Sequence, residues 1–153
     1  MSESLRDRRT RYARTILQSR SSSVALVGET SDLEGMRVLV LGCYPADTLA
    51  ALIHTECRRA EARLPDAHTE SRSADIVLVP HASLVTLGRI IGQAARSLDD
   101  HGRMVIAVPQ AERDFVGLAT RALVQAGFDT PYLQTDGGEM RIHTGRGEVP
   151  RRA

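Results

Sequence analysis

RVLVLGCYPADTLAAL, the stretch from Arg37 to Leu52, combines a continuous apolar run, a turn and the start of a helix. The run Val38–Leu41 is typical of a strand that is covered on both faces. The turn contains one glycine, Gly42, and Asp47 or Thr48 is predicted to cap the helix that follows. Units of this kind hold nucleotide-type ligands in α/β sheets, so the stretch is also the first candidate binding site.

The same alternation of apolar runs and helical patterns continues along the chain. Further strands are predicted at Cys57–Leu64, Ile76–Val79 and Met104–Val108. Helices are predicted at Leu84–Leu98, ended by Gly102, and at Arg113–Ala126, ended by Gly127. A final antiparallel pair is predicted for residues 132–133 and 140–143, around two glycines. The pattern indicates a doubly wound, mostly parallel sheet with helices on both faces and a C-terminal hairpin.

Residues 1–22 form a separate, arginine-rich block whose apolar residues fall close to one helical stripe. We predict an N-terminal amphipathic basic helix here, an α/β domain over residues 23–146 and a flexible tail over residues 147–153. The N-terminal helix is expected to pack on the domain, on a second subunit or on a partner protein. A lid over an anionic ligand is the alternative.

Composition excludes several classes of function. The net charge of +1 and the aromatic content of 3% do not favour nucleic-acid binding. The sequence contains neither an apolar run long enough to cross a membrane nor a secretory signal, so a cytoplasmic protein is expected. All twenty basic residues are arginine, which rules out chemistry that needs a lysine. The histidines and the two cysteines have no metal-ligand spacing, so no metal is expected.

Four segments together resemble the class I S-adenosylmethionine-dependent methyltransferases. They are Val38–Cys43, Asp75–His81, Arg103–Pro109 and the turn Ala126-Gly127-Phe128 before the closing hairpin. Their order along the chain agrees with that family, and the resemblance covers about residues 36 to 146. It implies a Rossmann-like fold and S-adenosylmethionine as cofactor.

The resemblance also assigns roles to residues of the first turn. Gly42 matches the first glycine of the cofactor loop, where the backbone approaches the methionine part of the cofactor, and Cys43 is a residue common in that loop. Tyr44 and Ala46 stand where the family usually has its next two glycines, and a tyrosine there would fill the cofactor space or require a rearranged loop. Asp47 follows and belongs to the same candidate cofactor site.

Two more residues complete the candidate site. Asp66 is the best match to the acidic residue that binds the ribose hydroxyls in the family, with Glu61 as a second choice. Only the nine residues Asp66–Ala74 lead up to the strand at Asp75, whereas the family normally has another helix, a strand and the adenine-binding loop in this interval. His81 comes just after the predicted strand Ile76–Val79 and Pro80, and it is the candidate general base; a histidine that only fixes the loop after Pro80 is the alternative.

Three functions remain open on these grounds. The first is a non-catalytic methyltransferase-fold protein that acts as a partner or stabilising subunit of an enzyme complex, with residues 1–22 as its docking element. The second is a small methyltransferase that acts on a small molecule. The third is the same fold with another anionic ligand bound at the Gly42 turn. We take the first as the main hypothesis from sequence.

Overall fold

The computed structural model describes residues 4, 33–42, 46–65, 67–80, 82–109, 113–136 and 139–146. In these residues six strands and three helices follow one another. Their bounds are β1 (Arg37–Leu41), α2 (Ala46–Ile53), β2 (Arg59–Arg63), β3 (Ala74–Val79), α3 (Leu87–Ser97), β4 (Leu98–Pro109), α4 (Arg113–Gln125), β5 (Tyr132–Asp136) and β6 (Glu139–Gly145). The predicted helix at residues 1–22, the start of the predicted domain at residues 23–32 and the tail at 147–153 lie outside the described residues, apart from residue 4.

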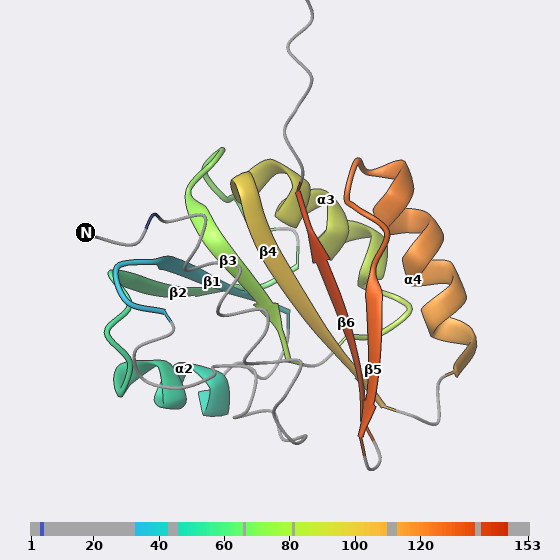
Figure 1. Cartoon of the computed structure of the whole chain (residues 1–153), viewed down its shortest axis with the longest axis horizontal. Coiled ribbons are helices and arrows are strands. Elements are labelled where there is room, and N and C mark those ends of the chain that lie inside the picture. The colour runs from blue at the N-terminus through green and yellow to red at the C-terminus, as the bar shows by residue number, and fades with distance from the viewer. Residues whose placement is uncertain are drawn as a thin grey trace, which may run out of the picture.

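The strands form one sheet in the order β2-β1-β3-β4-β6-β5 (Figure 1). The first four are parallel, and β6 and β5 are antiparallel to their neighbours. This confirms the predicted α/β class, the mostly parallel sheet and the C-terminal hairpin. The chain moves from β1 outward to β2 and then returns to the other side of β1 as β3. The strand order therefore reverses between β1 and β3, where open α/β sheets bind their ligands.

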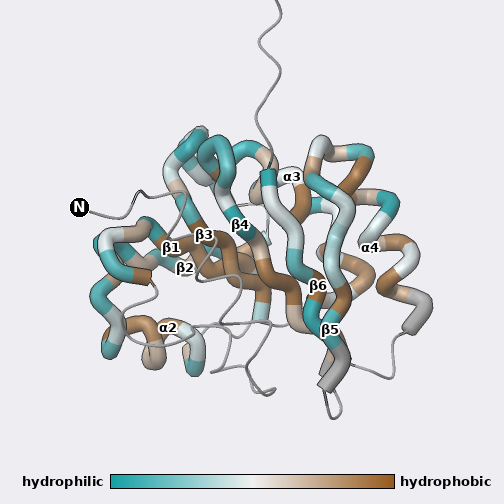
Figure 2. The backbone as a smooth tube through the Cα atoms, viewed as in Figure 1, coloured by the Kyte–Doolittle hydropathy of each residue, from teal (hydrophilic) through white to brown (hydrophobic). Residues whose placement is uncertain are grey.

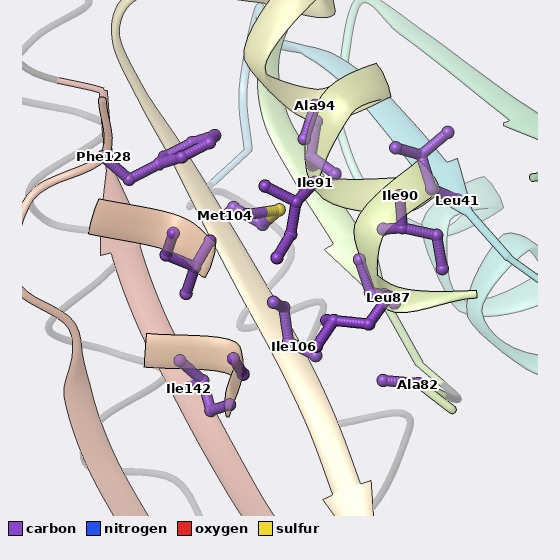
Figure 3. Close-up of a cluster of buried hydrophobic side chains, with 14 of the residues drawn as sticks. Leu41, Ala82, Leu87, Ile90, Ile91, Ala94, Met104, Ile106, Phe128 and Ile142 are labelled. Carbon is purple, nitrogen blue, oxygen red and sulfur yellow. The ribbon is translucent and has the colours of Figure 1, made fainter. Parts of the chain in front are cut away.

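The sheet is buried because its central strands are apolar on both faces. All six residues of β3 are buried, and Figure 2 shows hydrophobic residues along β1, β3 and β4. Val77 and Met104 contribute to a cluster with α3 and α4, part of which Figure 3 shows. Ile76 and Val105 face the other way, into a second cluster with Leu52 of α2. Alternate side chains of each strand thus fill two cores, and helices lie on both faces of the sheet.

The end of α3 differs from the prediction. The helix ends at Ser97, and β4 begins directly afterwards, so Gly102 lies within a strand and does not end the helix. Gly102 is required there because an added Cβ would lie 2.8 Å from Leu98 Cδ2 and 2.9 Å from the Asp99 carbonyl oxygen. Near the end of α3, the Arg146 guanidinium instead donates hydrogen bonds to the carbonyl of Ala95 at 2.6 Å and to that of Leu98, the first residue of β4, at 2.8 Å.

The end of α4 agrees with the prediction. Gly127 has a φ of +93°, a conformation that glycine adopts without strain. Its amide donates to the Val124 carbonyl at 3.1 Å, and the Phe128 amide donates to the Leu123 carbonyl at 3.0 Å. These two bonds form a Schellman motif, and both Leu123 and Phe128 are buried in the same core cluster. The motif turns the chain back toward β5 and β6.

An ion-pair network connects the amino ends of the strands. Asp75, at the start of β3, is 1% exposed. Its carboxylate accepts hydrogen bonds from the Arg37 amide at 2.9 Å and from Arg37 Nε and Nη2, both at 3.2 Å. Asp99 accepts a further bond from Arg37 Nη2 at 3.3 Å. The hydrogen bond with Asp75, which outweighs the cost of burial, raises the pKa of Arg37. The network lies opposite the edge where a ligand is expected, so its role is to stabilise the fold.

Candidate functional site

Gly42 directly follows β1 at the carboxyl edge of the parallel strands. Its φ of +108° lies in a region that residues with a side chain rarely adopt. Its amide donates to the carbonyl of Arg63 at 3.1 Å, which joins the turn to the end of β2. Because the strand order reverses beside β1, Gly42 lies at the switch point of the sheet, where open α/β sheets bind their ligands.

Helix α2 begins at Ala46, four residues after Gly42. Asp47 and Thr48 therefore lie inside its first turn, so the prediction that one of them caps the helix is wrong. The Asp47 side chain is exposed. Thr48 is 0% exposed, and its hydroxyl oxygen has no hydrogen-bond partner. Buried hydroxyl groups are normally hydrogen-bonded, so this group at the N-terminal end of α2 is unusual.

The loop after β3 leaves the sheet at the same edge as the Gly42 turn, since β1 and β3 are parallel neighbours. The Ala82 amide donates to the Ala107 carbonyl at 3.2 Å, so this loop stays close to β4. Two apolar side chains follow and are largely exposed, Leu84 at 57% and Val85 at 86%. The Ser83 and Thr86 hydroxyl groups share a hydrogen bond of 2.8 Å just before α3 begins.

The connection from β2 to β3 spans residues 64–73, and its described residues contain neither helix nor strand. The missing helix and strand agree with the short spacing in the sequence. Gln93 of α3 is 3% exposed, and its amide nitrogen donates to the carbonyls of Leu64 at 3.0 Å and Ala67 at 2.9 Å. Four residues later, the Ser97 hydroxyl donates to Thr69 at 2.6 Å. Polar contacts therefore hold this connection to α3.

Strand β2 carries charged side chains beside this connection. Glu61 forms ion pairs with Arg59 and with Arg63, the latter at 3.4 Å. The Arg63 side chain also donates to the Ala62 carbonyl at 3.0 Å. Glu61 is thus engaged within β2, which weakens it as the ribose-binding acid. A pocket opens between β2 and the connection, lined by Leu39, Arg59, Glu61, Arg63, His68, Thr69, Glu70 and Ser73.

Of the predicted site residues, the structure places Gly42 and Asp47 at the same end of the sheet. Cys43, Tyr44, Asp66 and His81 lie outside the described residues. In the part of the chain that is described, no group of three metal-ligating side chains occurs. None of the described helices combines the length and the apolar character that a membrane span requires.

Two buried polar residues of β6, Arg141 and His143, are not among the site residues predicted from the sequence. Arg141 is 1% exposed and His143 is 5% exposed. The Nε2 atom of His143 lies 3.1 Å from Gln134 Oε1 of β5. Burial, and secondly the charge of Arg141, lower the pKa of His143 to about 4. The alternation of Arg141 and His143 with the apolar Ile142 predicts a strand but does not show that both polar residues are covered.

Comparisons with known proteins agree with this architecture. The sequence matches no protein-family model and no curated protein. Among solved structures, an S-adenosylmethionine-dependent methyltransferase from Mesorhizobium loti has a TM-score of 0.60 at 11% identity, covering 81% of this chain and 96% of that one. Aeropyrum pernix fibrillarin, with natively bound S-adenosyl-L-methionine, has a TM-score of 0.60 at 15% identity, covering 85% of this chain and 76% of its own.

A third similar structure contains two bound small molecules. It is the Burkholderia thailandensis 1,6-didemethyltoxoflavin-N1-methyltransferase, with bound 1,6-didemethyltoxoflavin and S-adenosylhomocysteine. Its TM-score is 0.59 at 14% identity, covering 75% of this chain and 72% of that one. At these identities the likeness concerns the fold. The chain has the class I S-adenosylmethionine-dependent methyltransferase fold.

Proposed function

We propose that this chain binds S-adenosylmethionine beside Gly42 and acts as a small methyltransferase on a small molecule. The proposal is based on two features of the same turn. Gly42 has a φ of +108°, and the buried hydroxyl of Thr48, in the first turn of α2, has no hydrogen-bond partner. Similar solved structures contain S-adenosylmethionine or S-adenosylhomocysteine. This reverses the preference drawn from sequence, because the similar solved structures are S-adenosylmethionine-dependent methyltransferases.

The residues around this turn fit the methionine end of the cofactor. Gly42 has no side chain, so a ligand can approach its backbone closely. The N-terminal end of α2 carries a partial positive charge, which favours a carboxylate. The Thr48 hydroxyl can then donate the hydrogen bond that it lacks within the chain. Bound there, S-adenosylmethionine would supply an activated methyl group for transfer to the acceptor.

Two further roles follow from the resemblance. Asp66 would accept hydrogen bonds from the ribose hydroxyls, and His81 would remove a proton from the acceptor. Asp66 lies in the connection that Gln93 contacts on both sides, through the carbonyls of Leu64 and Ala67. This support from α3 favours Asp66 over Glu61, which already pairs with two arginines.

Two observations favour the non-catalytic alternative. The β2–β3 connection, residues 64–73, is short and shows neither helix nor strand in its described part, whereas the resemblance implies an adenine-binding loop in this region. In addition, Tyr44 and Ala46 replace two glycines of the family pattern. A chain with this fold and no cofactor would serve as the partner or stabilising subunit of an enzyme, and residues 1–22 would be its docking element.

Isothermal titration calorimetry of the full chain with S-adenosylhomocysteine separates the two functions. Saturable binding is expected, and its absence would favour the non-catalytic alternative. The double variant Tyr44→Gly, Ala46→Gly then shows whether the loop alone prevents binding, because restored affinity would identify these side chains as the obstacle. Deletion of residues 1–22 with measurement of the oligomer mass tests the docking role, and an unchanged mass without a loss of stability would argue against it.

A Thr48→Val variant tests the site itself. Because the Thr48 hydroxyl has no partner in the chain, its loss should leave the free energy of unfolding unchanged or increase it. Affinity for S-adenosylhomocysteine should fall by about tenfold, from the loss of one hydrogen bond. Thr120→Val is the matched control on α4, where the hydroxyl donates to the Val116 carbonyl at 2.9 Å. An unchanged affinity in Thr48→Val would remove this residue from the site.

A further inference from the structure

Strand β6 brings a guanidinium and an imidazole to one face of the sheet. Ile142 belongs to the core cluster with α3 and α4. Its neighbours Arg141 and His143 therefore face the opposite side, where α2 lies, because side chains alternate along a strand. They are paired with Ala107 and Val105 of β4, which belong to the second core cluster. Two polar residues thus continue an otherwise apolar face.

Arg141 lies at the same height on the sheet as the candidate cofactor turn. Arg141 pairs with Ala107 of β4. The residue before Ala107, Ile106, pairs with Val79 at the end of β3. Gly42 follows β1 at the corresponding level, because Val40 pairs with Leu78. Three strand spacings therefore separate Arg141 from Gly42, or about 14 Å between Cα atoms. An arginine side chain on the α2 side can reach toward a molecule that lies beside the bound cofactor.

His143 is held next to Arg141 in one protonation state. The contact of Nε2 with the Gln134 oxygen requires a hydrogen on Nε2, since an amide oxygen only accepts. In the neutral ring Nδ1 then carries the lone pair, and it is buried without a hydrogen-bond partner. The lowered pKa of His143, about 4, agrees with a neutral ring. The pair therefore offers a positive charge and an adjacent buried acceptor.

We infer that Arg141 and His143 bind a carboxylate-bearing methyl acceptor, an inference that rests on the proposed methyltransferase function. The planar guanidinium of Arg141 matches the two oxygens of a carboxylate. His143 Nδ1 accepts a hydrogen bond from an adjacent hydroxyl or N–H group of the same molecule. At 1% exposure of Arg141, such an ion pair is shielded from water, which strengthens it. The acceptor class is therefore small molecules with an acidic group.

Arg141 also takes part in an interaction within the chain, so the test must separate binding from a structural role. The probes are benzoate and benzamide, which differ in charge and have nearly the same shape. Binding of each to the full chain is measured by calorimetry after long incubation, because Arg141 is covered. We expect saturable benzoate binding and an affinity for benzamide at least tenfold lower. No benzoate binding, or equal binding of both probes, overturns the inference.

Variants and spectroscopy locate the binding. Arg141→Met should lose the preference for benzoate, and Arg121→Met, an exposed arginine of α4, should keep it. If Arg141→Met does not fold, nitrogen-15 spectra of the unmodified chain decide. Benzoate should then shift the Nδ1 resonance of His143 and leave that of the exposed His54 unchanged. A shift of the His54 resonance with no shift of the His143 resonance would refute the site. S-adenosylhomocysteine binding is measured separately, so failure of the cofactor site is distinguishable from failure of this inference.

Discussion

Replacing His143 with glutamine should make the free energy of unfolding less dependent on pH. In the folded chain the pKa of His143 is about 4, lowered from 6.5 mainly by burial. Between these two values the unfolded chain binds a proton at this residue and the folded chain does not. Acid therefore favours unfolding in this range. Above pH 6.5 this residue does not reduce the free energy of unfolding. Below pH 6.5 the free energy of unfolding decreases as the pH falls, until the folded pKa of about 4 is reached.

The size of the effect follows from the shift. Each unit of pKa corresponds to about 1.4 kcal/mol, so the wild-type chain should lose about 2 kcal/mol through this residue between roughly pH 7 and pH 5. His143→Gln keeps a polar group beside Gln134 and cannot titrate. Urea unfolding followed by circular dichroism at several pH values gives the free energy of unfolding for both chains.

The comparison between chains removes the contribution of carboxyl groups, which both share. His54→Gln is the control, because His54 is exposed on the surface after α2, and its pH profile should follow that of the wild type. A constant difference in stability between wild type and His143→Gln from pH 7 to pH 5 would refute the reasoning. It would mean that the folded chain protonates His143 as easily as the unfolded chain.

Three further predictions concern the fold and the turn after β1. Gly102→Ala should reduce the free energy of unfolding by about 1–3 kcal/mol, because the new Cβ would lie 2.9 Å from the Asp99 carbonyl oxygen. Gly88→Ala in α3, where nothing lies within 4 Å, should be neutral or stabilising, and equal effects in the two variants would contradict the packing argument. Asp75→Ala should cost about 1–3 kcal/mol in urea unfolding, since it removes the acceptor of the Arg37 amide, and Asp99→Ala should cost less. Gly42→Ala should cost about 1–3 kcal/mol from its φ of +108° and should weaken S-adenosylhomocysteine binding in calorimetry; an unaffected affinity would place the ligand elsewhere.

Much of the fold can be predicted from the sequence because local and tertiary preferences agree. The run Ile76–Val79 is apolar on every residue, and β3 is buried on both faces. Gly127 ends α4 as predicted, since its positive φ and the apolar Phe128 both favour that turn. The prediction that Gly102 ends α3 is wrong because a glycine that follows a helical pattern is also typical of a helix end. Its actual role is to allow close contact with Leu98 and Asp99, which depends on packing.

The candidate site is less predictable, because it depends on contacts between distant segments. The sequence predicts that Gly42 follows a buried strand at a candidate binding turn, but it does not show that the Thr48 hydroxyl is buried without a partner. The level of Arg141 beside Ala107 follows from strand register, which local patterns do not specify. The contacts of Gln93 with Leu64 and Ala67 join residues more than twenty positions apart. Such long-range hydrogen bonds have no local signature.

The charges of β2 bear on how this chain avoids association with its own copies. Among the described residues, β2 is the outermost strand on its side of the sheet, and an exposed strand edge is a template on which another chain can assemble. The Arg63 guanidinium already occupies the Ala62 carbonyl, and Glu61 pairs with the arginines on both sides. An incoming strand would have to break these contacts and remove three charges from water. The charged side chains of β2 therefore protect this edge of the sheet against pairing with strands of other chains and against growth into fibres.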